Sequence, residues 1–327
     1  MPSRLTVPIS LLDRARTREG EEPAAALRAA VDRAQRAEQL GYHRFWVAEH
    51  HAVPGIAGSA PAVLLAAIGA RTSRIRLGTG GIMLANHQPI VVAEQALALA
   101  GLFTGRVDVG LGRSLGFTQP VREALQVTSY PARTFSRDIA EVRAYLHGEA
   151  PVTATPATST PPPIYVLATR QGLTTAAELG LPVVVGGPSL RGALTELTAY
   201  RRDFAPSAQC PEPQVIISVD VMVAASRAQA RDLLLPEAIS LARSRTTGSF
   251  APLRPVPDGG LAEVSAKERA VVAQQLQLAV YGTAAEVAGE LGSLVSRTGA
   301  TEVLATTSTY DHGALAAADT ALAELAG

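Results

Sequence analysis

Three titratable side chains, Glu49, His50 and His51, directly follow a short apolar run at residues 45–48. This run, Phe-Trp-Val-Ala, has the length and the β-forming residues of a strand that is buried on both faces. Titratable groups at the end of a buried strand are costly to desolvate unless they line a site. In parallel α/β folds, ligands bind at the carboxyl ends of the strands. We therefore expect a functional site at the end of this strand.

Small and polar residues also follow three later runs that are predicted to be strands. Each group alone has an ordinary explanation, such as a tight turn for a glycine pair or a solvated charge for an arginine. Because the carboxyl ends of parallel strands meet at one rim, all the groups would gather there, which favours a site. The groups are Gly80 and Gly81 after residues 74–79, Gly112, Arg113 and Ser114 after residues 107–111, and Thr169, Arg170, Gln171 and Gly172 after residues 164–167.

The elements that must position these residues alternate between strand and helix along the whole chain. Eight strand–helix units indicate an α/β fold of the (β/α)8 TIM-like type with inserted loops, and a doubly wound open sheet is the alternative. The Pro- and Thr-rich residues 149–163 are interpreted as a surface loop, so residues 1–327 are expected to form a single domain. The predicted strands are residues 5–10, 45–48, 74–79, 107–111, 164–167, 182–185, 214–223 and 302–306.

The composition excludes several classes of function. The chain has 327 residues, of which 47% are apolar, and its 29 basic residues balance 29 acidic residues. No basic face is implied, so nucleic acid is not an expected partner. Cys210 is the only cysteine and cannot form an internal disulfide. No apolar run has the length of a membrane span, and the first residues lack a signal-peptide pattern, so a cytoplasmic protein is expected.

Two kinds of catalytic site can be considered from the motifs alone. A metal site is disfavoured because the neighbouring His50 and His51 would point to opposite faces of a regular strand, and no HExxH motif or cysteine cluster accompanies them. A serine hydrolase is a competitor, because the sequence around Ser114 matches G-x-S-x-G after a strand. Asp258 and His312 follow in the order that such enzymes use, although this hypothesis leaves the histidine and glycine pairs unexplained.

A phosphate-bearing cofactor explains more of the pattern. Residues 169–172 lie between a strand and a helix, where backbone N–H groups, the Thr169 hydroxyl and a nearby arginine would bind an anion. Flavin mononucleotide fits this arrangement, with its phosphate at that rim and its ring across the barrel mouth. There Gly80 and Gly81, which lack side chains, would allow the ring to approach the backbone closely.

Five segments together resemble the luciferase-like flavin monooxygenases, the superfamily of bacterial luciferase, most closely their single-chain actinobacterial-type branch. The segments are YHRFWVAEHH (42–51), RIRLGTGGIMLAN (74–86), GRVDVGLGR (105–113), AAELGLP (176–182) and TGATEVLATTSTYDH (298–312). The resemblance implies a TIM-like barrel that takes reduced FMN from a separate flavin reductase. Reduced FMN and O2 would form a C4a-peroxyflavin that oxygenates a small organic substrate, in keeping with natural-product metabolism. A homodimer is what the family suggests.

The resemblance also implies roles for individual residues. His50 matches the catalytic histidine, which we expect to act as acid or base with a pKa near neutrality. Gly80–Gly81 matches a non-proline cis peptide under the flavin ring. Arg113 and Thr169 match phosphate-binding residues, and His51 and Asn86 match neighbours of the flavin. The sequence departs from the family at ATRQGL (168–173), where Arg170, Gln171 and Gly172 lie, and at SLGFTQP (114–120). A deazaflavin-dependent oxidoreductase, the Ser114 hydrolase and a non-catalytic flavin-binding barrel are the alternatives that stay open.

Overall fold

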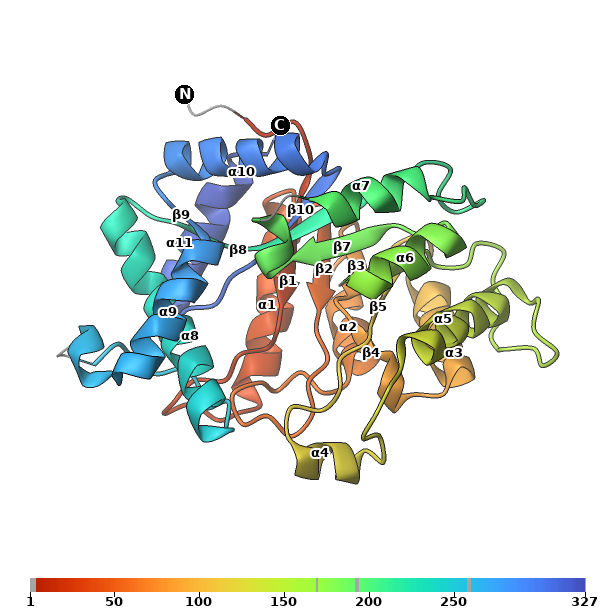
Figure 1. Cartoon of the computed structure of the whole chain (residues 1–327), viewed down its shortest axis with the longest axis horizontal. Coiled ribbons are helices and arrows are strands. Elements are labelled where there is room, and N and C mark those ends of the chain that lie inside the picture. Colours follow the sequence, from red (N-terminus) through yellow and green to blue (C-terminus); the bar gives the residue numbers. More distant parts are fainter. Residues whose placement is uncertain (1–3, 169, 192–193, 258–259, 327) are drawn as a thin grey trace.

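Eight parallel strands form a barrel at the centre of the molecule (Figure 1). They are β1 (Ile9–Asp13), β2 (Arg44–Val47), β3 (Arg76–Thr79), β5 (Val107–Gly112), β6 (Ile164–Leu167), β7 (Val183–Gly186), β8 (Val215–Val223) and β10 (Glu302–Thr306). The computed structural model of the chain describes residues 4–168, 170–191, 194–257 and 260–326. Strand β10 pairs with both β1 and β8, which closes the barrel. The (β/α)8 TIM-like prediction is therefore confirmed, and the open-sheet alternative is wrong.

Helices connect the strands and surround the barrel on the outside (Figure 1). Two of them, α9 and α10, begin with capping boxes in which a Ser or Thr hydroxyl and a Glu carboxylate each bind the other residue's backbone N–H. Residues 149–163 contain no helix or strand, as their composition predicts. The helices are α1 (Ala25–Gln39), α2 (Pro61–Gly69), α3 (Pro89–Leu102), α4 (Gln119–Ala124), α5 (Ala132–His147), α6 (Arg170–Leu179), α7 (Thr195–Arg202), α8 (Arg227–Thr247), α9 (Ala266–Leu278), α10 (Ala284–Thr298) and α11 (His312–Ala323). Two short strands, β4 (Ile82–Met83) and β9 (Val280–Gly282), add to β5 and β8.

The first strand begins later than the sequence predicts. The expected strand spans residues 5–10, whereas β1 begins at Ile9 and ends at Asp13. Pro8 has no N–H to donate, so it cannot form a ladder hydrogen bond, and only its carbonyl is used, by the Val303 N–H. Leu5 makes only an isolated bridge to Ala326 near the C-terminus. The shift matters because it places Asp13 and the loop after it at the carboxyl rim.

Alternate residues of β2 show how the barrel interior is filled. Trp46 belongs to the hydrophobic cluster inside the barrel, whereas Phe45 and Val47 belong to the larger cluster between barrel and helices. Gly78 lies opposite Trp46 in the neighbouring strand β3. A Cβ at Gly78 would lie 2.1 Å from the indole nitrogen of Trp46. The glycine therefore makes the space that the indole fills.

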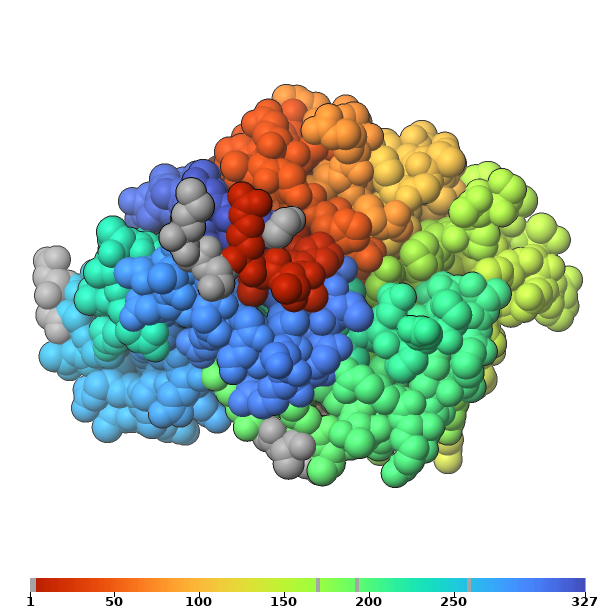
Figure 2. All heavy atoms as spheres, turned by 90° about the horizontal axis from the view of Figure 1, so that it is seen from above, coloured from red at the N-terminus to blue at the C-terminus, as the bar shows by residue number. Residues whose placement is uncertain are grey.

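The two ends of the described chain lie together on one face of the molecule. The Leu5 N–H donates to the Leu325 carbonyl, and Figure 2 views this face, with the N-terminal segment in red at its centre. In Figure 1 the same ends lie at the top, and α4, which follows β5, lies at the bottom. No helix in the described parts of the chain combines the length and apolar character that a membrane span requires.

Candidate active site

A cavity of about 500 Å³ lies at the carboxyl ends of β2, β3, β5 and β6. It unites three of the four residue groups that the sequence places on this rim. Its polar and glycine lining consists of Glu49, His50, His51, Gly80, Gly81, Gly112, Arg113, Ser114 and Gly116. Its apolar lining consists of Ala48, Val53, Met83, Leu115, Phe117 and Leu167. A mostly apolar pocket with a few converging polar groups is the usual form of a small-molecule site.

The Gly80–Gly81 peptide bond between β3 and β4 is cis. A Cβ at Gly80 would lie 2.5 Å from a methyl group of Leu12, and a Cβ at Gly81 would lie 2.8 Å from the Gly110 carbonyl oxygen. Both glycines therefore pack directly against the barrel interior, where no side chain fits. Their peptide group borders the cavity without a side chain in between, which suits the close approach of a planar ligand.

His50 lies beside a buried cluster of charges that the sequence does not reveal. Arg16 donates from Nε to Glu237 at 2.7 Å, and a nitrogen of Arg14 lies 3.3 Å from the other Glu237 oxygen. Burial lowers the pKa of His50 to about 4, and the charges of Arg14 and Arg16 add to this effect. Its Nδ1 is buried and has no hydrogen-bond partner among the described residues. The expectation of a pKa near neutrality is therefore wrong. With a pKa of about 4, His50 is a neutral imidazole at physiological pH.

This shift predicts a pH dependence of stability. His50 titrates at about 4 in the folded chain, against an ordinary value of 6.5, so between these values the unfolded chain binds a proton that the folded chain does not. The stabilisation is fully present above pH 6.5 and is lost as the pH falls towards 4. We expect the wild type to lose about 1–3 kcal/mol more than His50→Gln between pH 7 and pH 4.5. Urea unfolding of both proteins at the two pH values measures the difference, and equal losses would contradict the shift.

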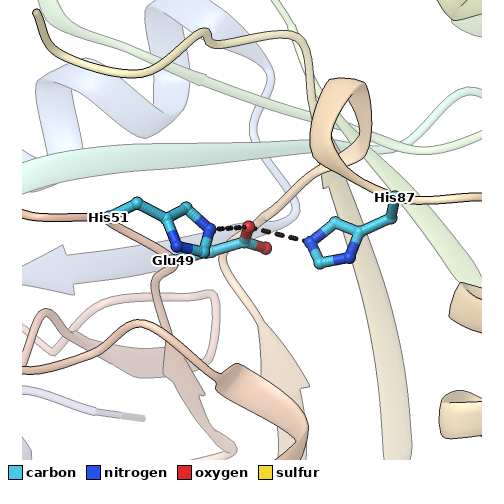
Figure 3. Close-up of side chains that lie close together, drawn as sticks. All are labelled: Glu49, His51 and His87. Atoms are coloured by element: carbon cyan, nitrogen blue, oxygen red, sulfur yellow. Dashed lines mark hydrogen bonds and ion pairs between the residues drawn. The ribbon is translucent and has the colours of Figure 1, made fainter. Parts of the chain in front are cut away.

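Glu49 lies between two histidines (Figure 3) and also contacts the backbone of β4. Its Oε1 lies within hydrogen-bond distance of two ring nitrogens, Nε2 of His51 at 2.6 Å and Nε2 of His87 at 2.8 Å. Its Oε2 accepts the Met83 N–H at 3.0 Å. Burial alone would raise the pKa of Glu49, but the hydrogen bonds from His87, His51 and Met83 outweigh it and lower the pKa. Glu49 is therefore a buried carboxylate with three donors.

The predicted phosphate-binding residues are only partly brought together. Arg113 at the cavity rim donates from a terminal nitrogen to the side-chain oxygen of Gln171 at 2.7 Å. Gly172 is buried in the first turn of α6, and Arg170 begins that helix. Thr169 lies outside the described residues. Asn86 does not line the cavity, yet both its amide atoms are buried and have no partner in the described parts of the chain.

The residues of the hydrolase hypothesis do not meet. Ser114 is exposed at the rim of the cavity. His312 lies at the start of α11, where its Nε2 is 3.0 Å from Glu21, and it lines a different cavity between α1 and α11. Asp258 lies outside the described residues. The serine and the proposed base therefore have no common site.

Sequence reasoning missed four residues that act on Glu49 or His50 from outside the cavity lining. His87 follows Asn86 directly, but nothing in its position shows that it reaches a carboxylate 38 residues earlier. Arg14, Arg16 and Glu237 are joined across more than 200 residues of sequence. The only sequence feature that could have indicated Arg14 and Arg16 is their position directly after the first strand. Because the sequence predicts the end of that strand at residue 10 instead of Asp13, it does not place the two arginines at the rim.

Comparison with known proteins gives the family. A model of the luciferase-like monooxygenase family matches residues 7–302. A protein of Escherichia coli K12 described as a luciferase-like monooxygenase is 34% identical over 318 residues, which cover 94% of each chain. These matches extend over nearly the whole chain and include every strand of the cavity.

Solved structures agree with this assignment. The crystal structure of apo-MsnO8 has a TM-score of 0.85 and 29% sequence identity and covers 98% of both chains. The oxygenating constituent of 3,6-diketocamphane monooxygenase from Pseudomonas putida, solved with FMN, has a TM-score of 0.75 and 15% identity. It covers 98% of this chain and 99% of its own, and its likeness shows the fold. The chain therefore belongs to the luciferase-like monooxygenase family and is an oxidoreductase.

Proposed function

We propose that this enzyme is an FMN-dependent monooxygenase that uses reduced FMN and O2 to oxygenate a small organic substrate. The observation that carries the proposal is the cavity in which the Gly80–Gly81 peptide, His50 and Arg113 lie together at the carboxyl rim. When bound, reduced flavin supplies the electrons that activate O2. The chain's own residues then have to hold the flavin, exclude water and control a proton.

The residues present fit a flavin. The peptide of Gly80 and Gly81 offers a surface without side chains to a planar ring. Asn86 lies outside the cavity lining, but its buried amide has an unpartnered donor and an unpartnered acceptor, and the pyrimidine part of a flavin carries both kinds of group. Arg113 is available for a phosphate, and its bond to Gln171 fixes the direction of its guanidinium group. We infer that these residues bind the ring and the phosphate.

His50 and the apolar lining would carry the remaining tasks. As a neutral imidazole, His50 has one ring nitrogen that accepts a proton, and its buried Nδ1 is not engaged by any described residue. Val53, Leu115 and Phe117 cover the cavity with apolar surface, which keeps water from the reacting atoms. We therefore propose that His50 accepts or holds a proton during oxygenation and that it does not act as an imidazolium acid.

Two further parts of the proposal concern partners. We propose that a separate reductase supplies reduced FMN, as in the family that the chain resembles, and that substrates come from natural-product metabolism.

We also propose a homodimer, because Val63 on α2 and Leu102 on α3 are 72% and 68% exposed on neighbouring helices. Light scattering after size exclusion measures the mass, and a monomer at micromolar concentration would exclude the dimer.

The decisive test is anaerobic titration with reduced FMN, followed by mixing with 18O2 and a panel of small ketones, thioethers and phenols. We expect saturable flavin binding and incorporation of one labelled oxygen atom into a product. Preferential binding of a deazaflavin, without oxygen incorporation, would replace the proposal with a deazaflavin oxidoreductase. Hydrolysis that is lost in Ser114→Ala would replace it with a hydrolase, and flavin binding without oxygen use would leave a binding protein.

Arg113→Ala tests the phosphate contact. We expect it to weaken FMN binding by about 10–100-fold, because a hydrogen bond to a charged group contributes about 1.5–3 kcal/mol. Riboflavin lacks the phosphate, so its affinity should not change. Fluorescence titration with both flavins measures the effect, and Arg36→Ala on the exposed side of α1 is the matched control. Equal losses for FMN and riboflavin would show that Arg113 does not bind the phosphate.

A further inference from the structure

The Glu49 carboxylate receives two imidazole donors on the same oxygen, and its side chain is completely buried. His51 and His87 approach from two different segments, one after β2 and one after β4, as Figure 3 shows. The N–O distances of 2.6 and 2.8 Å are those of charge-assisted hydrogen bonds. Each Nε2 must therefore carry a proton, because a carboxylate with lowered pKa can only accept.

A metal ion is the other arrangement for two histidines and a carboxylate, and the ligand atoms of this cluster lie within 4.8 Å of one another. Two ligands of one metal, each bound at about 2.0–2.2 Å, would be separated by about 3 Å or more. Both N–O distances here are shorter than that. The distances therefore favour protons between these atoms over a metal ion.

The proton on Nε2 determines what His51 offers to the cavity. In a neutral imidazole with Nε2 protonated, Nδ1 is a hydrogen-bond acceptor. His51 lines the cavity, and its Nδ1 has no hydrogen bond to any residue that the structure describes. The cavity thus has two histidines of different kind: His50 without a carboxylate partner, and His51 with one.

We propose that Glu49 is a positioning residue that holds His51 as the Nε2–H tautomer and so leaves Nδ1 as an acceptor for a donor group of the bound ligand. His87 is the second donor, which fixes the orientation of the carboxylate. The Met83 N–H on Oε2 joins the same carboxylate to the segment after Gly80 and Gly81. Only the identity of the ligand's donor rests on the proposed function, because the tautomer exists without a ligand.

Nitrogen NMR of protein labelled with 15N-histidine tests this directly without flavin, and the chain has only six histidines. We expect His51 to show a protonated Nε2 and an unprotonated Nδ1 at pH 7.5. In Glu49→Gln one acceptor oxygen replaces two, and it cannot accept from both histidines and from the Met83 N–H on the other side, so this tautomer should give way to an averaged signal. Glu21→Gln, which changes the exposed pair with His312, is the matched control and should leave His51 unchanged.

His87→Ala gives a second test if Glu49→Gln does not fold. It keeps the carboxylate, so His51 should retain the Nε2–H tautomer, and its loss there would contradict the assigned role of Glu49. An Nδ1–H tautomer in the wild type, or an unchanged His51 in Glu49→Gln, would overturn the proposal. Titration with Zn²⁺ tests the metal arrangement: stoichiometric binding that His87→Ala abolishes would also overturn it. None of these outcomes depends on oxygenase activity, so the proposal can fail while the FMN assignment holds.

Discussion

Asp108→Ala is expected to reduce the free energy of unfolding by about 3–5 kcal/mol. The Asp108 carboxylate is wholly buried inside the barrel and pairs with two guanidinium groups, those of Arg44 at 2.8 Å and of Arg76. It also accepts the indole N–H of Trp46 at 3.2 Å. Removing it leaves Arg76 without its only described carboxylate partner and Arg44 with Glu302 alone. An uncompensated charge in a barrel interior is among the costliest defects a substitution can cause.

Urea unfolding followed by fluorescence measures this effect, since Trp46 is the only tryptophan and lies next to the mutated carboxylate. Asp203→Ala is the matched control, because Asp203 also pairs with an arginine, Arg202, but both side chains are more than half exposed. There the expected loss is small, because an exposed ion pair is screened by solvent and contributes little to stability. A loss that small for Asp108→Ala would mean that water reaches this end of the barrel.

The position of this network illustrates which parts of the fold can be predicted from sequence. Two strands, Ile164–Leu167 and Glu302–Thr306, have the predicted boundaries, because each has an apolar centre between segments rich in Pro, Gly, Ser or Thr. Alternation along β2 follows from its period, so the side of the strand on which Arg44 lies can be inferred once the strand is known. Its partners cannot, because Asp108 and Glu302 are 64 and 258 residues away.

The cavity shows the same limit. That His50, Gly80, Gly81 and Arg113 would share a rim follows from the parallel strand order, and the structure places them around one cavity. Whether a histidine on that rim is charged depends on its three-dimensional neighbours. A histidine ordinarily has a pKa near neutrality, but burial, together with the charges of Arg14 and Arg16, lowers the pKa of His50. Local sequence does not encode the proximity of those arginines to the imidazole.

His50→Gln is expected to lower the rate of substrate oxygenation by about 10²–10⁴-fold, the usual contribution of one positioned proton acceptor. The proposal requires a neutral imidazole that accepts or holds a proton, and glutamine keeps the approximate size and polarity but cannot take up a proton near neutral pH. FMN affinity should change by less than about threefold, because the ring and phosphate contacts are assigned to other residues. Product formation at saturating reduced FMN, with peroxide release measured in parallel, gives the rate.

His43→Gln is the control, because His43 is exposed and directly precedes β2, at the opposite end of that strand from His50, so its rate should equal that of the wild type. The dependence of the oxygenation rate on pH tests the protonation state of His50 separately from any effect of the substitution on packing. Since His50 is already neutral above about pH 5, the wild-type rate should show no inflection from this group between pH 6 and 8. If His50→Gln oxygenates as fast as the wild type, proton control belongs to another group. His51, whose Nδ1 is free for a ligand while Glu49 holds its Nε2, would then be the residue to test.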